Sequence, residues 1–197
     1  MKKILLVLCL LVSCSVWADA KDVLKQRLDK VKGFYAEFSQ EVKTADDQLI
    51  QEGKGKLWVS RPNYFNWTLS EPDETLILSD GNALWIYTPM VEQVTVMALN
   101  QAVDNRLLLL ITNSDNAVWN DYQVSRKQNT FTLIPTDNSA QHFTISVLPT
   151  GMIADFTIIE SDGQRSFYQL SHQSLGKVDM KHFKFTIPKN VTVDDQR

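Results

Sequence analysis

The sequence predicts a mainly β (α+β) protein, in which about ten antiparallel strands bend into a barrel or half-barrel that two helices cover. Three features support this prediction. From Gly53 onward, short segments alternate between apolar and polar residues, as half-buried strands do. Turn pairs such as Asp80-Gly81 and Asp162-Gly163 separate many of them. The run Leu107 to Ile111 is continuously apolar and almost pure leucine, which favours a short helix.

The N-terminus resembles a secretory signal, because two lysines precede the apolar run Ile4–Val12 and small residues follow it. We therefore expect residues 1–18 to be a signal peptide, cleaved after Ala18. Residues 19–197 would then form a single domain. The apolar run is too short to span a membrane. A competing interpretation is that LVSC is a lipoprotein processing site, which would leave Cys14 acylated.

Loss of residues 1–18 would change the chemistry of the chain. It removes both cysteines, Cys9 and Cys14, so we expect no disulfide. It also removes two of the 20 basic residues and none of the 23 acidic ones. The resulting net charge of about −5 argues against binding to nucleic acid.

The elements follow one another along the chain. From Asp22 to about Val42, apolar residues recur every three or four positions, which predicts one long amphipathic helix. Asp104 or Asn105 would cap the short leucine-rich helix. The expected strands are KLWVS, YFNWTL, TLILS, ALWIYT, QVTVMA, TFTLIP, HFTISV, ADFTIIE, SFYQLS and KHFKFTI.

A bent sheet of this size has a concave face lined by every second residue. Either the two helices fill that interior, and the residues are ordinary core, or an apolar cavity remains that can hold a greasy ligand. On the expected registers the face carries Leu57, Val59, Phe65, Trp67, Leu76, Leu78, Leu84, Ile86, Phe131, Leu133, Phe143, Ile145, Phe156 and Ile158.

Arg61 ends one of these strands, directly before Pro62. It can be a solvated loop cation at the mouth of the barrel. Alternatively, its five donors can reach backbone carbonyls of a neighbouring element, which a partly buried guanidinium needs. The short leucine helix is the nearest candidate, because its C-terminal carbonyls lack intrahelical partners.

Four blocks of sequence carry a resemblance to a known family: LKQRLDKVKGFYAEFSQEV, EGKGKLWVSRPNYFNW, PDETLILSDGNALWIYTPMVEQV and VTVDDQR. In this order, from Leu24 to the last residue, the chain resembles the LolA family of periplasmic outer-membrane lipoprotein carriers. The resemblance implies an incomplete antiparallel β-barrel of about ten or eleven strands with a helical lid. It also implies a periplasmic, monomeric chaperone that has no cofactor and no enzymatic activity.

The resemblance implies roles for particular residues. Arg61 would latch the lid through hydrogen bonds to lid carbonyls, which break when lipid enters. Phe65 matches the family aromatic that matters for accepting cargo from the inner-membrane ABC transporter LolCDE, and the outer-membrane lipoprotein LolB would be the acceptor. Four leucines in the lid depart from the mixed lids of many members. The lid would be Leu107, Leu108, Leu109, Leu110 and Ile111, and the lipid-binding cavity would be Phe65, Trp67, Leu76, Leu78, Ile86, Phe143 and Phe156.

Three other classes of protein are alternatives. An enzyme is disfavoured, because His142, His172 and His182 lack the spacing of metal ligands and no nucleophile or phosphate-binding motif is present. An outer-membrane receptor of the LolB type, acylated at Cys14, would share the fold and stays open. An envelope sensor with the same half-barrel would need a second domain, for which the chain is too short.

Overall fold

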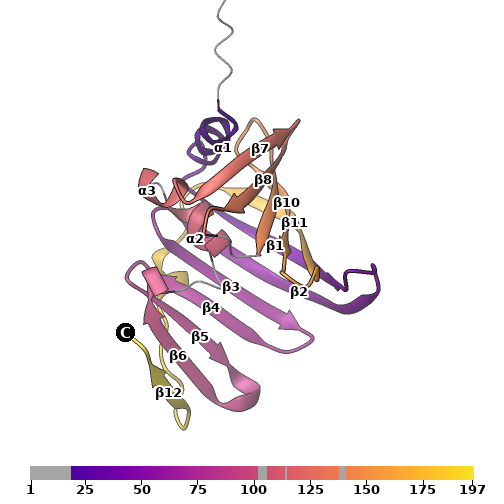
Figure 1. Cartoon of the computed structure of the whole chain (residues 1–197). Coiled ribbons are helices and arrows are strands. Elements are labelled where there is room, and N and C mark those ends of the chain that lie inside the picture. Colours follow the sequence, from indigo (N-terminus) through magenta and orange to yellow (C-terminus); the bar gives the residue numbers. More distant parts are fainter. Residues whose placement is uncertain (1–18, 102–105, 114, 138–140) are drawn as a thin grey trace, which may run out of the picture.

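The fold is an open, strongly curved sheet. The computed structural model describes residues 19–101, 106–113, 115–137 and 141–197 (Figure 1). Twelve strands pair in the order β12-β6-β5-β4-β3-β2-β1-β11-β10-β9-β8-β7. Strands β12 and β7 are the two edges, so the barrel is incomplete, as predicted. Neighbours are antiparallel except β12 and β6, which run parallel.

The strands and helices have the following bounds. The strands are β1 Gly33–Lys43, β2 Leu49–Ser60, β3 Tyr64–Glu71, β4 Thr75–Asp80, β5 Ala83–Thr88, β6 Gln93–Ala98, β7 Tyr122–Lys127, β8 Thr130–Pro135, β9 His142–Val147, β10 Ile153–Ile159, β11 Arg165–Leu175 and β12 Thr192–Asp195. The helices are α1 Ala20–Leu28, α2 Arg106–Thr112 and α3 Asn116–Trp119, with 3-10 turns η1 Pro89–Val91, η2 Leu99–Gln101 and η4 Met180–Phe183.

The single long helix expected from Asp22 to Val42 is wrong. Helix α1 ends at Leu28, and the second half of the segment is strand β1. An apolar spacing of four fits both periods, so Phe38 and Val42 satisfied the helical pattern although they belong to a strand. The buried residues of β1 alternate: Phe34, Ala36, Phe38, Gln40 and Val42.

The leucine-rich segment is helical, as predicted, and forms α2. Figure 1 shows α2 lying within the curve of the sheet and α1 across one end of it. The proposed capping residues Asp104 and Asn105 lie outside the described residues. Of the five lid residues, Leu107, Leu108, Leu110 and Ile111 are buried. Helix α2 therefore directs most of its apolar surface into the main core.

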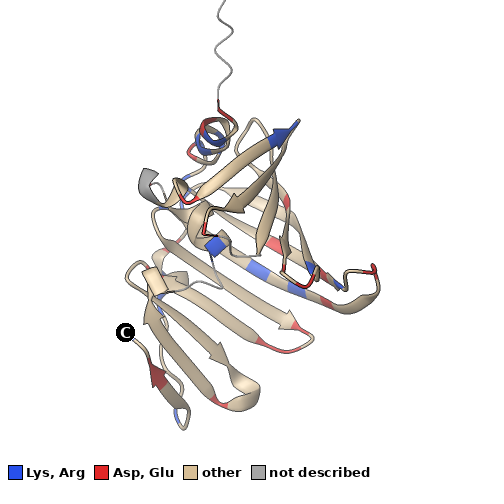
Figure 2. Ribbon diagram, viewed as in Figure 1, with Lys and Arg blue, Asp and Glu red and all other residues tan. Residues whose placement is uncertain are grey.

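A second apolar layer covers the outer face of one half of the sheet. Chain from residue 178 to the C-terminus returns over β2 to β6, and β12 pairs with β6. Phe183 packs on Tyr64, with 5.6 Å between ring centroids, and Phe185 packs 5.6 Å from Trp85. This half of the sheet is therefore apolar on both faces. Figure 2 accordingly shows the charges of β3 and β4 at the strand ends.

Gly55 on β2 makes room for an aromatic side chain of the inner face. It pairs directly with Phe38, and a Cβ atom at Gly55 would collide with the Phe38 ring and the Thr68 backbone oxygen. We expect Gly55→Ala to lower the free energy of unfolding by about 1–3 kcal/mol, because overpacking forces side chains and backbone to shift. Urea denaturation measures this loss. The control Lys56→Ala, exposed on the same strand, should stay within about 0.5 kcal/mol of wild type; an equal loss in both variants would contradict the prediction.

Candidate functional site: a lidded apolar cavity

A small apolar cavity lies between α2 and the concave face of the sheet. Its volume is about 170 Å³. Pockets for drug-sized ligands are larger, about 300–1,000 Å³. A long acyl chain therefore fits beneath α2 only if the helix moves away from the sheet. The lining residues are Trp67, Ile77, Leu107, Leu108, Phe156, Ile158 and Tyr168.

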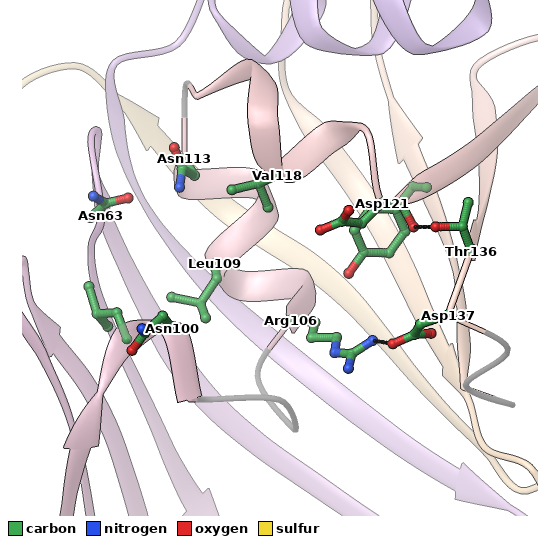
Figure 3. Close-up of a pocket in the computed structure, with 11 residues that line it drawn as sticks. Asn63, Asn100, Arg106, Leu109, Asn113, Val118, Asp121, Thr136 and Asp137 are labelled. Atoms are coloured by element: carbon green, nitrogen blue, oxygen red, sulfur yellow. Dashed lines mark hydrogen bonds and ion pairs between the residues drawn. The ribbon is translucent and has the colours of Figure 1, made fainter. Parts of the chain in front are cut away.

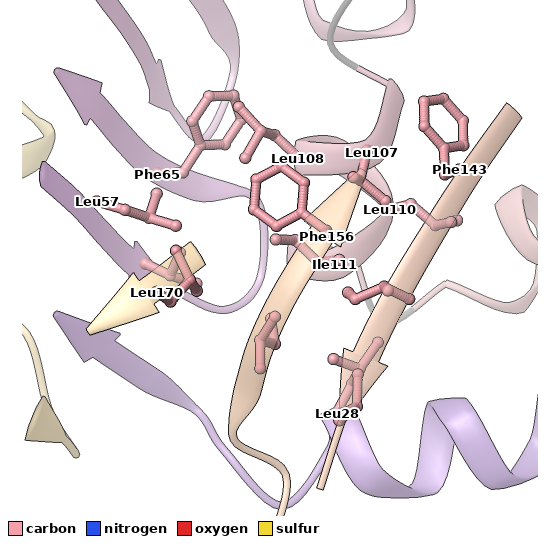
Figure 4. Packing of buried hydrophobic residues seen from close by; sticks show 14 of the residues in the cluster. Leu28, Leu57, Phe65, Leu107, Leu108, Leu110, Ile111, Phe143, Phe156 and Leu170 are labelled. Carbon is pink, nitrogen blue, oxygen red and sulfur yellow. The ribbon is translucent and has the colours of Figure 1, made fainter. Parts of the chain in front are cut away.

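Most of the predicted cavity residues lie on this inner face. Trp67 and Phe156 line the cavity itself. Phe65 and Phe143 are fully buried in the same cluster, and Ile86 packs against that cluster. Figure 4 shows Phe65 and Phe156 in one shared interior with the lid residues Leu107, Leu108 and Leu110.

Leu76 and Leu78 are a correction, because they lie on the opposite face. Trp67 pairs with Ile77, so Ile77 shares its face, whereas Leu78 pairs with Asn66 and faces outward. Leu78 is buried beneath the returning C-terminal chain, not in the cavity. The predicted register of β4 was wrong by one residue. Such an error moves every side chain of a strand to the other face of the sheet.

The turn after β4 contains the signal that finds the correct register. Ser79 pairs with Leu84, so a two-residue loop at Gly81 and Asn82 joins β4 to β5. With that loop, Leu84 and Ile86 face inward only if Ser79 and Ile77 do so too. The predicted set placed Leu78 and Ile86 together, which this hairpin does not allow. Ile77, Ile158 and Tyr168 line the cavity but were absent from the predicted cavity set, although Ile158 was predicted for the concave face.

Arg61 reaches the end of α2, which is one of the two arrangements that the sequence left open. Its Nη2 donates to the backbone oxygen of Asn113, the residue after α2, at 3.2 Å. Its Nη1 lies 2.7 Å from a carboxylate oxygen of Asp29, at the C-terminus of α1. The Arg61 side chain is only 4% exposed. The guanidinium therefore ties together both helices that cover the sheet.

The loop around Arg61 also holds the C-terminus of α2 through its backbone. The Asn63 amide donates to the Thr112 oxygen at 3.3 Å, and the Arg61 amide donates to the Lys32 oxygen at 2.8 Å. Asn63 has a φ of 67°, in the left-handed region that asparagine tolerates better than most residues. The Ser79 hydroxyl donates to the Asn63 oxygen. The last carbonyls of α2, which a helix leaves open, thus find donors in this loop.

Burial and the Asp29 carboxylate have opposite effects on the charge of Arg61, and burial has the larger effect on its pKa. Burial lowers the pKa of Arg61, and Asp29 opposes that shift by its charge and its hydrogen bond. Within the described residues, the buried Nε of Arg61 has no hydrogen-bond partner. An unsatisfied buried donor costs about 1–3 kcal/mol. The closed arrangement therefore leaves one buried donor of Arg61 without a hydrogen bond among the described residues.

A polar pair interrupts the apolar wall of the cavity. Gln40 Nε2 donates to the Tyr168 hydroxyl at 3.0 Å, from neighbouring positions on β1 and β11. The Tyr168 ring stacks on Phe156 at 4.7 Å and meets Trp67 edge-on at 5.0 Å. Burial raises the pKa of Tyr168 to about 12, so the hydroxyl stays neutral near pH 7. The wall is aromatic and uncharged there.

A larger hollow of about 640 Å³ lies on the outer side of α2 (Figure 3). Leu109, the least buried lid leucine, faces it, and Val118 of α3 lines another side. At its rim, Arg106 pairs with Asp137 at 2.8 Å. This hollow gives α2 space on the side away from the sheet.

The predicted alternatives concerned histidines and clusters of metal-ligating residues. Across those residues, no three His, Cys, Asp or Glu side chains gather as a metal site would require. His182 stacks on Trp58, with 4.9 Å between the rings. No helix built from the described residues has the length and apolar character to cross a membrane.

The fold and the site define a class of protein: an open half-barrel whose apolar interior is closed by a helical lid. Comparison with protein families identifies the family within this class. The family model described as outer membrane lipoprotein carrier protein LolA matches residues 29–186. The chain belongs to the LolA family.

Relatives along the whole chain agree with this assignment. Proteins named outer-membrane lipoprotein carrier protein from Edwardsiella ictaluri and Yersinia enterocolitica are 48% and 46% identical. Both alignments cover 100% of this chain, and 99% and 100% of the respective relatives. A crystal structure of a LolA superfamily protein from Nitrosomonas europaea matches with a TM-score of 0.50 at 14% identity, covering 86% of this chain and 99% of that one. This structural likeness concerns the fold alone.

The raised pKa of Tyr168 predicts a pH dependence of stability. The unfolded chain releases the phenolic proton near pH 10, whereas the folded chain keeps it to about pH 12. The contribution of neutral Tyr168 to the free energy of unfolding is therefore fully present below pH 10, and it is lost as the pH rises toward 12. Relative to Tyr168→Phe, wild type should lose about 2 kcal/mol more over that interval. Urea midpoints at pH 7, 10 and 12 measure the difference; parallel curves for the two proteins would contradict it.

Proposed function

We propose that this protein is a periplasmic chaperone that shields the acyl chains of lipoproteins and carries them to the outer membrane. The cavity beneath α2 is the observation that carries the proposal. It is apolar, it is closed by a short leucine-rich helix, and that helix is fastened by polar contacts at one buried end. The names of the full-length relatives support the same role.

The energetics explain why such a carrier needs a lid that closes. Each methylene buried from water contributes roughly 0.8 kcal/mol, so several acyl chains bind very tightly. A carrier must nevertheless release its cargo. Contacts that exist in the empty, closed state and break in the loaded state weaken net binding by their own free energy. Arg61, with its bonds to Asn113 and Asp29, provides such contacts.

The partners follow from the same proposal. Cargo would be accepted from the LolCDE transporter at the inner membrane and passed to LolB at the outer membrane, with the carrier acting as a monomer. Phe65, which the resemblance connects with acceptance from LolCDE, is a residue of β3 that is fully buried in the core cluster. Phe65 would therefore affect the acceptance of cargo either by shaping the cavity or by becoming exposed after the lid moves.

The periplasmic location rests on the N-terminal segment, which lies outside the described residues. We propose that residues 1–18 are a signal peptide and that residues 19–197 form the soluble carrier domain. The alternative, a LolB-type receptor acylated at Cys14, is less well supported, because relatives matched over their full length are named as carriers. Nothing in the site requires a cofactor or an enzymatic step.

Release of lipoproteins from inner-membrane spheroplasts tests the function directly. Purified residues 19–197 should release a triacylated lipoprotein as a soluble one-to-one complex. We expect Arg61→Leu to form the complex but to unload it at least tenfold more slowly, because the loaded state no longer competes with a latched one. Size-exclusion chromatography and transfer to LolB-containing membranes measure the two steps. If wild type released no lipoprotein, the carrier function would be refuted.

Adjacent residues on β4 test which face of the sheet binds cargo. Ile77 lines the cavity, whereas Leu76 points to the outer face, and both are partly buried. Ile77→Gln should reduce capture of lipoprotein severalfold, because a polar group would enter an apolar site. Leu76→Gln is the matched control and should capture cargo as wild type does. The reverse order of the two variants would show that the cavity is not the cargo site.

A further inference from the structure

Asp29 occupies a position that local helix energetics disfavour. It is the C-terminal cap of α1, where the helix dipole is negative and a carboxylate is less favourable than a cation. Lysine or arginine would be the ordinary residue for this end of a helix. The preceding turn indeed carries Lys25 and Arg27. A cation outside α1 can compensate this unfavourable position.

The compensation is Arg61. Nη1 of Arg61 lies 2.7 Å from Oδ1 of Asp29, in an ion pair that is also a hydrogen bond. The two partners differ in environment: the Asp29 side chain is 48% exposed, and the Arg61 side chain is 4% exposed. The cover over the guanidinium includes the chain at the end of α2, since the other donor of Arg61 binds the Asn113 oxygen.

We propose that Asp29 is a positioning residue for the lid: its carboxylate supplies the counter-charge that lets α2 close over the buried Arg61 guanidinium. The inference rests on the proposed function for its consequence in cargo transfer. Its structural part, a link between Asp29 and closure of α2, stands on the contacts alone. In this proposal α1 covers one end of the sheet and also carries the residue that pairs with Arg61.

The contribution of Asp29 depends on the state of the lid. When α2 lies over Arg61, the guanidinium is shielded from water, and a covered charge without its partner would be disfavoured. When α2 moves away, the guanidinium becomes hydrated, and an exposed ion pair contributes little. Asp29 therefore stabilises the closed state more than the open state. Without it, the equilibrium shifts toward the open state, and cargo is held longer.

A purely structural role for Asp29 makes a different prediction. If Asp29 acted only as a helix cap, Asp29→Asn would relieve an unfavourable interaction with the dipole of α1. Helix α1 would then be equally or more stable, and α2 would be unaffected. The two roles are separated by measuring the protection of α2 apart from that of the rest of the fold.

The experiment combines hydrogen exchange with a mutant cycle. Exchange of the α2 amides is measured in the cargo-free protein, with β1 and β2 amides as the internal reference. We expect Asp29→Asn to lower α2 protection at least fivefold without a matching change in β1 and β2. Asp29→Glu, which keeps the charge, should recover most of the protection. The matched control Asp22→Asn, an exposed acidic residue in the first turn of α1, should behave as wild type.

Arg61 supplies the second side of the cycle. In an Arg61→Leu background, Asp29→Asn should change neither α2 protection nor the rate of cargo transfer, because the partner charge is gone. Additive effects of the two substitutions would overturn the proposal. So would unchanged α2 protection in Asp29→Asn, an equal fall in β1 and β2, or a failure of Asp29→Glu to restore protection.

The two measurements also separate this inference from the proposed function. Hydrogen exchange needs no lipoprotein, so it tests the link between Asp29 and the lid even if wild type extracts no cargo. Conversely, normal extraction and transfer by Asp29→Asn with unchanged exchange would leave the carrier function standing and refute the role of Asp29.

Discussion

The structure depends on one constraint, which is that a curved sheet of twelve strands offers more apolar inner surface than its helices cover. Helix α1 lies across one end, and α2 is short, so the interior is closed rather than filled. The space that remains is lined by Trp67, Phe156 and Tyr168 together with leucines of α2. An interior of this kind gains free energy from any apolar guest that can displace the helix. The closed cavity of about 170 Å³ is smaller than a pocket for a drug-sized ligand, so a larger guest would require α2 to move.

The outer face of the sheet contributes mainly to stability, and the inner face provides the candidate binding surface. On the outer face, Leu78, Val94 and Val96 are buried on the side that the returning C-terminal chain covers, and Phe183 and Phe185 pack on neighbouring aromatic residues there. This outer layer stabilises β3 to β6 without help from α2. The inner face is thereby free to exchange its contacts with the lid for contacts with a guest. A sheet with only one apolar face would lose its stability when the lid opened.

Much of this arrangement was open to prediction, and the failures have physical causes. Alternation and turn pairs predicted the antiparallel sheet, and the leucine run predicted α2, because both patterns are local.

The switch from α1 to β1 was missed because a spacing of four residues satisfies both the helical and the strand period, so Phe38 fitted a helix. The face of Leu78 was missed because hydrophobic content does not fix register where both faces of a strand are buried. The hairpin at Gly81 and Asn82 fixes it. The Arg61 contact with Asn113 was anticipated from orphan carbonyls, whereas its ion pair with Asp29 was not, because no sequence pattern relates an arginine to a helix 32 residues earlier.

The latch is effective because polar contacts at the two ends of α2 differ in environment. Near its N-terminus, Arg106 pairs with Asp137 where both side chains are accessible to solvent, and such pairs contribute little. At its C-terminus, the loop from Arg61 to Asn63 meets the helix in a buried setting, where each lost bond has a larger cost. The polar contribution to the free energy of closure is therefore concentrated at the C-terminal end of α2, whereas its buried leucines contribute along the helix. A guest that displaces that end opens the cavity without disturbing the sheet, and loss of the guest restores the same few contacts. A lid held evenly along its length by apolar packing would lack this property, because a greasy guest replaces apolar contacts with equivalent ones and nothing would then favour its release.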